Sequence, residues 1–554
     1  MSRKIHRLAL PLLLLPVMCM LTACAMLAAP GTLPSITQKA EAIQQLQESR
    51  TQAAQPLLSQ LVIGDIPAVQ DQETGIFYYS LPQGEKAEQL SLSWNGMPEV
   101  KLAVCADGAS DALRNGGTLQ LLAYTKTEWQ KLQLVCTTLP IMVLEVPGEA
   151  DAIEKYEKST LKLTLYDNRQ NAGMHMLQAE GTIHVRGVGS ARFPKKGYRL
   201  TLRHTNGEEN DMALLGLRTD GDWILYAGYT ESEKIRQVYT AQLWRESCGL
   251  DNEFGVNNSN EYKFLELFLN GRYWGLYALG YPIDGKQLNI GEGEHTFSKQ
   301  DFLVSESGID FDAPAEIPGY EVIAGDTVNT DWAGIWKPLK DYYKTLLQEN
   351  ADPEKLRQLA DTSNAIDCWL FTNLIQGVDQ VLDEGTLYNY RLSTKQTQNG
   401  LKILFTPWDF DLTWGVVSAE QPGYTLSPQD NVLMNLNPIH RLLQLQDSQT
   451  LAQVQQRYQQ LRAGAWSETA MQDLLDGYEA DIFASGAYQR DHERWPESAC
   501  NEGQKDLATF RAYVNERLQG MDAFMQSLGQ DTANTVSAVQ ESHRASSEAP
   551  RGSH

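Results

Sequence analysis

The chain has 554 residues and a mass of 62.0 kDa, which is too long for one ordinary hydrophobic core, so we expect two or three folded units. Hydrophobic residues make up 42% of it and there are 12 Trp, which excludes a fully disordered or fibrous chain. The formal net charge of −24 excludes nucleic acid as an expected partner, because such a surface repels phosphates.

The N-terminus has the pattern of a secretory signal. Three basic residues precede an apolar run from Leu8 to Leu21, and Leu-Thr-Ala-Cys occupies residues 21–24. This tetrapeptide resembles a bacterial lipobox, so residues 1–23 are predicted to be a signal peptide and Cys24 the lipidated residue. The protein is then expected at the bacterial cell membrane, lipid-anchored and facing outside the cytoplasm. The alternative is an uncleaved membrane anchor.

Composition and patterning divide the rest of the chain. Residues 24–55 are rich in Gln, Ala, Thr and Ser and are predicted to be a lipidated tether. Residues 56–137 are predicted to form a small all-β, sandwich-like domain. Residues 138–528 mix strand and helix patterns, and residues 529–554 are predicted to be a disordered tail. The strands expected in the all-β domain are 76–79, 90–94, 100–104 and 132–135.

Five cysteines remain in the predicted mature body, and none forms a CxxC pair, so zinc-ribbon and redox motifs are absent. Cys105 and Cys136 lie in one predicted domain and could form a disulfide. Buried free thiols are the alternative.

A Gly-rich turn separates two strand-like runs between residues 181 and 203. A period of two along the second run places Lys196 on the same face as Tyr198, and Lys195 on the face of Arg199. An inward-pointing lysine beside a small-residue loop suits phosphate binding. The alternative is a basic edge strand whose lysine lies along apolar surface.

The next two motifs are mainly structural. Thr230 and Glu233 have the spacing of a helix capping box, and Gly249 matches a helix stop. Arg236 lies beside the apolar stripe of this helix, where it could hold a carboxylate or phosphate or cover a rim. Asn270-Gly271, between two apolar runs, predicts a type I′ hairpin.

A fourth motif carries acidic residues. Asp379 follows a helix-like stretch, and Asn389 lies on a strand that an Asn399-Gly400 turn joins to the run ending in Asp409 and Asp411. A hairpin would bring Asn389 close to Asp409, and in an extended stretch the last two carboxylates face the same way. This oxygen set suits Mg²⁺ or Mn²⁺ shared with phosphates, and Asp379 could accept a proton from an attacking hydroxyl. The alternative is that one of the last two acids caps the next segment.

In this order, the motifs resemble the CotH spore-coat protein kinase family. The resemblance covers roughly residues 138–525, most of the predicted mature chain. It is carried by Arg186-Gly187, Pro194-Lys195-Lys196-x-Tyr198, Trp223 through Arg236, Leu269-Asn-Gly-x-Tyr273, and Asp379, Asn389 and Pro407-Trp-Asp-Phe-Asp411.

The resemblance implies an α+β chain with an atypical protein-kinase-like domain after the all-β domain. It implies ATP with Mg or Mn as cofactors, and transfer of the γ-phosphoryl group to Ser or Thr of secreted or envelope proteins. By position, the resemblance makes Asp379 the catalytic residue. It implies that the cofactor is bound by Lys196, Arg186, Ser190 and Arg236. It implies that the metal is bound by Asn389, Asp409 and Asp411.

The sequence departs from the usual family pattern at Val188, Gly189, Gln237 and Tyr281, all on the nucleotide side. The alternative function is therefore a catalytically inactive surface adhesin or envelope-assembly lipoprotein on the same scaffold. Nucleotidyl transfer also remains open, since it needs the same metal and phosphate contacts as phosphoryl transfer.

Overall fold

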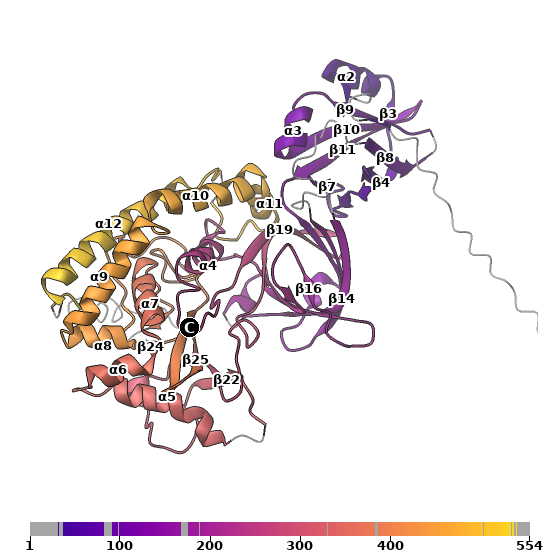
Figure 1. The fold of residues 1–554 in the computed structure, drawn as a ribbon. Coiled ribbons are helices and arrows are strands. Elements are labelled where there is room, and N and C mark those ends of the chain that lie inside the picture. Colours follow the sequence, from indigo (N-terminus) through magenta and orange to yellow (C-terminus); the bar gives the residue numbers. More distant parts are fainter. Residues whose placement is uncertain are drawn as a thin grey trace, which may run out of the picture.

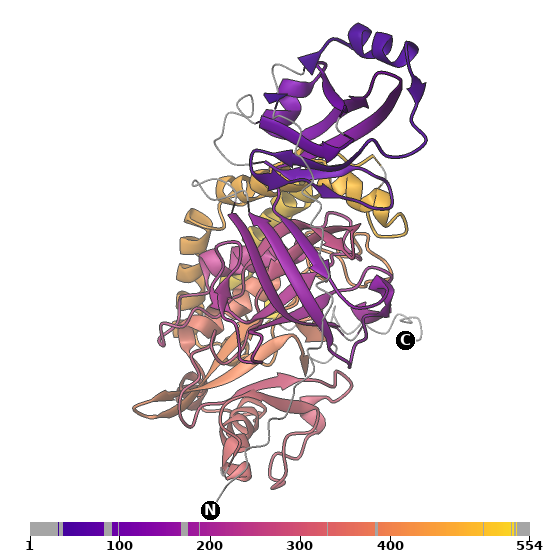
Figure 2. The same ribbon diagram turned by 90° about the vertical axis from the view of Figure 1, so that its right-hand side faces the viewer.

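The chain is an α+β protein, described by a computed structural model (Figure 1). A β-rich part (indigo in Figure 1) packs on a β-barrel (magenta), and a mostly helical part (orange and yellow) lies beside the barrel. Figure 2 shows the β-rich part above the barrel strands. The described residues are 31–32, 37–81, 91–97, 99–167, 175–187, 189–328, 331–382, 386–501, 503–532, 534–536 and 539.

The N-terminal part contains two sheets that enclose a common core, which confirms a β-rich region there. It also contains two helices, α2 (Ala40–Glu48) and α3 (Ala109–Asn115), and the second of them lies inside the predicted all-β domain. One sheet has the order β1 (Gly31–Thr32), β8 (Ser91–Gly96), β4 (Leu58–Ile63) and β5 (Ile66–Pro67); the other has β2 (Thr37–Gln38), β9 (Lys101–Cys105), β10 (Gly117–Tyr124), β11 (Glu128–Thr137), β7 (Phe77–Ser80) and β6 (Val69–Gln70), with β3 (Thr51–Gln52) beside β11.

The predicted tether over 24–55 differs from the structure in its second half. Strand β2 pairs in parallel with β9, and β3 pairs in parallel with β11, so the chain from Thr37 onward belongs to the larger sheet. Backbone pairing needs no large apolar side chains, which is why the polar composition hid these strands.

The β-rich part contacts the barrel through aromatic side chains. The rings of Tyr78 and Tyr273 stack with centroids 5.2 Å apart, and Phe268 packs edge-on against Tyr78 at 5.1 Å. The Asp71 carboxylate accepts the Tyr273 backbone N–H at 3.2 Å. The contact is therefore both apolar and hydrogen-bonded.

Seven strands close the barrel around a second apolar core. Asn270 and Gly271 have φ values of 49° and 75°, which confirms the type I′ hairpin between β19 and β20. The barrel order is β12 (Ile141–Glu145), β13 (Ser159–Asp167), β14 (His175–Val185), β15 (Tyr198–Arg203), β18 (Asp222–Tyr226), β20 (Arg272–Gly280) and β19 (Tyr262–Leu269), and the short pair β16 (Met212–Ala213) and β17 (Thr219–Asp220) lies outside it.

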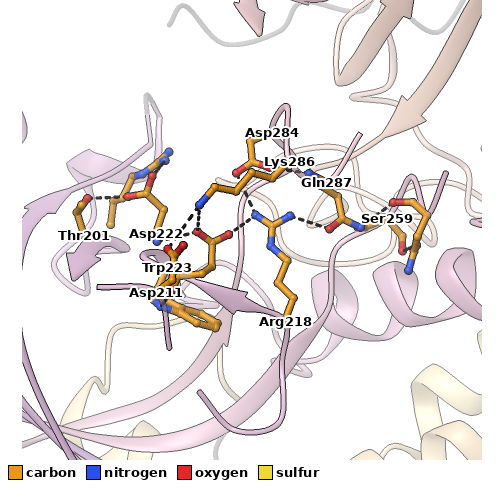
Figure 3. Close-up of polar contacts among 12 residues, drawn as sticks. Thr201, Asp211, Arg218, Asp222, Trp223, Ser259, Asp284, Lys286 and Gln287 are labelled. Carbon is orange, nitrogen blue, oxygen red and sulfur yellow. Dashed lines mark hydrogen bonds and ion pairs between the residues drawn. The ribbon is translucent and has the colours of Figure 1, made fainter. Parts of the chain in front are cut away.

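A polar network fixes the segment that leaves the barrel after β20 (Figure 3). Arg218 Nη2 lies 2.9 Å from Asp284 Oδ2, and its Nη1 donates to Gln287 Oε1 at 2.7 Å. Gln287 Nε2 in turn donates to the carbonyls of Asn257 and Ser259, at 2.6 and 2.8 Å. The network joins the barrel to the chain that leads into the next sheet.

Helix α4 (Arg236–Ser247) starts later than predicted, and the predicted capping box is wrong. The Glu231 carboxylate accepts the backbone N–H groups of Arg236 and Gln237, at 2.7 and 3.0 Å. Lys234 has a φ of 62°, so the chain turns just before the helix and Glu231 reaches its N-terminus instead of Glu233.

The helical part also contains a four-stranded sheet and holds the largest core. The predicted hairpin around Asn399-Gly400 is confirmed by the antiparallel pairing of β25 with β26. The sheet order is β22 (Tyr320–Ala324), β21 (Thr296–Lys299), β25 (Tyr390–Thr397) and β26 (Gly400–Pro407). A separate short strand pair is formed by β23 (Val381–Leu382) and β24 (Thr386–Leu387). The helices of this part are α5 (Trp332–Leu346), α6 (Pro353–Leu359), α7 (Thr362–Leu374), α8 (Pro438–Gln444), α9 (Ser448–Ala463), α10 (Glu468–Glu479), α11 (Ala487–Arg494) and α12 (Ala508–Gln530).

The C-terminal boundary differs from the prediction. Helix α12 continues to Gln530, and Val536 is fully buried in the core, so the start of the predicted disordered tail is wrong. Residues 540–554, and residues 1–30 with the predicted signal peptide and Cys24, lie outside the described residues. No helix within the described ranges is long and apolar enough to cross a membrane.

The five described cysteines are free thiols, so Cys105 and Cys136 form no disulfide.

Candidate functional site

Asp379 lies just beyond the C-terminal end of α7. Gln376 has a φ of 51°, and this left-handed residue turns the chain away from the helix axis before Gly377. Asn389 Nδ2 donates to Asp379 Oδ2 at 2.5 Å. Asn389 is buried and lies in the short connection between β24 and β25, just before the strand that was predicted to contain it. The bond brings together two of the predicted site residues.

Asp409 and Asp411 follow the C-terminal end of β26. The backbone N–H of Trp408 donates to the carbonyl of Asn389 at 3.1 Å, which places Asp409 beside the Asn389 segment as the hairpin predicts. The stretch is not extended, however, because Asp409 has a φ of 60°. The strand ends at Pro407 and the chain turns there, so the two carboxylates share the site through a turn rather than through strand alternation.

The acids influence one another strongly. Burial raises the pKa of Asp411 well above its usual range, and the charges of Asp409, Asp379 and Glu231 raise it further. Burial also raises the pKa of Asp409. The positive charge of Arg186 acts in the opposite direction, and it is the largest effect that lowers this pKa. The carboxylates of Asp379, Asp409 and Asp411, which are half-buried, therefore lie close enough for their charges to act on one another, and a bound cation would be stabilised among them.

Arg391 was not identified from the sequence. Its guanidinium lies 4.1 Å from the centroid of the Trp408 ring, and the charge of Asp409 favours its protonated form. Burial lowers the pKa of Arg391 to about 10. Asn389 lies before the first residue of β25, so strand alternation gives no signal that relates Arg391 to it.

Glu231 is a second group that the sequence analysis missed. Its side chain is 1% exposed, and it accepts the Tyr226 hydroxyl at 2.6 Å besides capping α4. The charges of Asp411 and Asp409 help to raise the pKa of Tyr226, after burial and Glu231 itself. No local sequence signal indicates this position, since it depends on how α4 packs against the acids.

The lysine pair before β15 differs from its predicted arrangement. The strand begins at Tyr198, so alternation does not apply to Lys195 and Lys196. Lys195 is the buried lysine, 1% exposed, whereas Lys196 is half-buried and its Nζ donates to the carbonyl of Ala191 at 2.6 Å. Lys196 therefore contacts the Gly-rich loop, and its predicted role as a phosphate ligand stays a prediction.

The Gly-rich loop contributes an exposed turn. Gly187 has a φ of 92°, a conformation that favours glycine, and Ser190 is exposed at the start of a short 3-10 helix, Ser190–Arg192. Val188, one of the departures from the family pattern, lies outside the described residues. Arg186, at the start of this loop, is the loop residue whose charge acts on Asp409.

Arg236 lies away from any solvent-accessible ligand. It is 0% exposed, its Nη2 lies 2.9 Å from Glu233 Oε2, and its guanidinium is 5.5 Å from the ring centroids of both Tyr424 and Phe510. A side chain with no exposed surface does not contact a bound nucleotide. Of the roles predicted for Arg236, holding a carboxylate is the one that the structure shows.

Within the described residues, no three His, Cys, Asp or Glu side chains form a group that could hold a metal ion by themselves. The predicted ligands are Asn389, Asp409 and Asp411. Asn389 Nδ2 is engaged by Asp379, which leaves its amide oxygen as the coordinating atom. These oxygen donors, with their shared excess of negative charge, fit Mg²⁺ or Mn²⁺.

The fold and the site together define an α+β protein in which three carboxylates and one amide side chain are gathered at one place. A protein-family model described as CotH kinase protein matches residues 183–521, from β14 into α12. The chain therefore belongs to the CotH kinase family and is a kinase-like protein, as its motifs predicted. No curated protein matches it.

Proposed function

We propose that this chain is a phosphotransferase of the bacterial cell surface that moves the γ-phosphoryl group of ATP to Ser or Thr of secreted or envelope proteins. The observation that carries the proposal is the convergence of Asp379, Asn389, Asp409 and Asp411 at the ends of α7 and β26. Lipidation of Cys24 would anchor the protein to the membrane.

Each residue has a defined role in this reaction. Asp379 accepts the proton of the acceptor hydroxyl as its oxygen bonds to the γ-phosphorus and ADP leaves. A divalent cation held by Asn389 and Asp409, with Asp411, would neutralise charge on the nucleotide phosphates. Arg186 lies close enough to stabilise ionised Asp409, and its position in the Gly-rich loop also suits a phosphate contact.

One observation favours the alternative function, a surface binding or envelope-assembly protein without turnover. Neither lysine of the Lys195-Lys196 pair is engaged at the acidic site: one pairs with Asp491, and the other contacts Ala191. A protein of this kind would keep the scaffold without cycling nucleotide.

Nucleotide binding separates the two functions without a known acceptor. We would measure the thermal unfolding of the purified full-length protein with ATP and either Mg²⁺ or Mn²⁺. Asp409→Ala tests the site, and Asp341→Ala, an exposed acid on α5, is the matched control. A ligand at a hundredfold excess over its Kd adds about 2.7 kcal/mol to stability. We expect a metal-dependent rise in Tm for the wild type and the control, and none for Asp409→Ala.

Labelled ATP then identifies the transferred group. Transfer of label from the γ-position to envelope proteins, lost in Asp379→Asn while the ATP-induced rise in Tm remains, would support phosphoryl transfer. Transfer from the α-position would indicate nucleotidyl transfer. The absence of any rise in Tm with every nucleotide and metal would favour the alternative function.

A further inference from the structure

Two buried glutamines hold both polar atoms of the peptide unit between Asp409 and Phe410. Gln380 Nε2 donates to the Asp409 carbonyl at 2.6 Å and also to the Trp408 carbonyl at 3.0 Å. On the other side, the Phe410 N–H donates to Gln237 Oε1 at 2.6 Å. The two glutamine side chains are 0% and 2% exposed, respectively, so water does not compete for these bonds.

This peptide unit needs external support. Asp409 has a φ of 60°, a left-handed conformation that is unfavourable for most residues with a side chain. The turn follows β26 directly, where the ladder bonds to β25 have ended at Pro407. The direction of the Asp409 carboxylate is therefore set by what holds its backbone.

The two glutamines come from separate elements. Gln380 follows Asp379 directly, so its bonds tie the loop of the proposed base to the loop of the proposed metal ligand. Gln237 lies in the first turn of α4, the helix whose N-terminus is capped by Glu231. The Asp409 backbone thus connects three elements that are far apart in the sequence.

We propose that Gln237 and Gln380 are positioning residues that fix Asp409 in the conformation required to bind a divalent cation. The assignment depends on the proposed function, because it presupposes a cation at Asp409. It also gives a physical role to Gln237, one of the departures from the usual family pattern. Residues that orient a metal ligand typically contribute 10–100-fold to metal affinity.

The test uses Gln237→Met and Gln380→Met, which keep side-chain length but make no hydrogen bond to the peptide unit. Mn²⁺ alone is the probe, and its Kd is measured from the electron paramagnetic resonance signal of free Mn²⁺. Hydrogen exchange of the segment around Phe410 is followed in parallel without metal. We expect faster exchange and roughly 10–100-fold weaker Mn²⁺ binding in each variant. We expect no further loss in the double variant, because both residues act on one peptide unit.

Val454→Ala is the control for general destabilisation, since Val454 is fully buried on α9 and its truncation leaves a cavity. It should lower Tm without changing the Mn²⁺ affinity. Replacing each of the two glutamines with Glu provides a second matched pair of variants. Gln237→Glu keeps an acceptor oxygen for the Phe410 N–H and should bind Mn²⁺ more tightly than Gln380→Glu, which loses the donor to the Asp409 carbonyl.

The outcomes separate this assignment from the proposed function. Wild-type Mn²⁺ affinity in both Met variants, unchanged exchange around Phe410, or fully additive losses would overturn the assignment and leave the proposed function standing. No Mn²⁺ binding by the wild-type chain, with or without ATP, would overturn both.

Discussion

Lys195 and Asp491 form a buried ion pair that joins the barrel to helix α11. Lys195 Nζ lies 2.7 Å from Asp491 Oδ1, and neither side chain is exposed. The same carboxylate oxygen accepts the Leu276 N–H at 2.9 Å, and Lys234 Nζ lies 3.8 Å from the other oxygen. Burial lowers the pKa of Lys195 to about 8, against the opposing charge of Asp491. The pair thus fixes the barrel against the C-terminal part of the chain.

Removing the anion should therefore be costly. Asp491→Ala would leave Lys195 and Lys234 buried without their carboxylate, and breaking a buried pair typically costs about 3–5 kcal/mol. Urea unfolding at pH 7 measures the loss. Lys196→Met is the control, because Lys196 is half-buried and its Nζ donates to the backbone carbonyl of Ala191. Equal stability of Asp491→Ala and the wild type would contradict the structural role.

Arg186 should control the protonation of Asp409. Its charge is the largest that opposes the raised pKa of Asp409, so Arg186→Met should raise that pKa further. Protons then compete with metal up to higher pH, and the loss of Mn²⁺ affinity relative to the wild type should be greater at pH 6 than at pH 8. Arg186→Lys, which keeps the charge, should behave more like the wild type. A loss independent of pH would indicate a different role.

Arg517 on α12 holds the end of α7 that leads to Asp379. Its guanidinium donates to the carbonyls of Asn373 at 2.7 Å, Leu374 at 3.1 Å and Pro428 at 2.8 Å, and it is fully buried. Arg517→Met leaves several buried carbonyls without a donor, and we expect the free energy of unfolding to fall by roughly 3 kcal/mol or more. We also expect the variant to lose the ATP-induced rise in Tm.

Arg517→Lys distinguishes geometry from charge, because a lysine cannot reproduce the planar fork of donors. It should recover little of the stability measured by urea unfolding. Full recovery by lysine would show that the positive charge alone, and not the set of three carbonyl contacts, stabilises this region.

His440 should make the protein sensitive to mild acid. It is 2% exposed, and burial lowers its pKa to about 3 from 6.5. Because the unfolded chain binds the proton first, this group costs stability as the pH falls from about 6.5 toward about 3. Between pH 7.5 and pH 5 the cost is about 2 kcal/mol.

The His440→Gln variant tests this cost. Urea unfolding at pH 7.5 and pH 5 should show a pH-dependent loss that is smaller in the variant than in the wild type by about 2 kcal/mol. The same pH-dependent loss in both proteins would show that other groups account for it.

Several parts of the site could be predicted from local patterns, and others could not. The hairpins at Asn270-Gly271 and Asn399-Gly400 follow from turn chemistry between alternating strands, so Asn389 and Asp409 were correctly placed near each other. The inward direction of Lys196 was wrong, since β15 begins only at Tyr198 and alternation holds only inside a strand.

Residues whose role depends on distant partners were missed or placed in the wrong setting. Arg236 is enclosed by Tyr424 and Phe510, which lie about 190 and 270 positions further along the chain, so no neighbouring residue indicates its burial. Gln380 and Gln237 have no motif of their own, and only the shared peptide unit at Asp409 shows what they do.

By itself, the sequence determined the α+β character, the two hairpins, the order of the motifs and through them the family, because alternation and turn chemistry are local properties of the chain. Only the tertiary structure decided that Lys195 pairs with Asp491, that Glu231 caps α4, and that two glutamines hold the backbone of Asp409. These outcomes depend on which buried polar group finds which partner, and that choice is made by packing between elements far apart in the sequence.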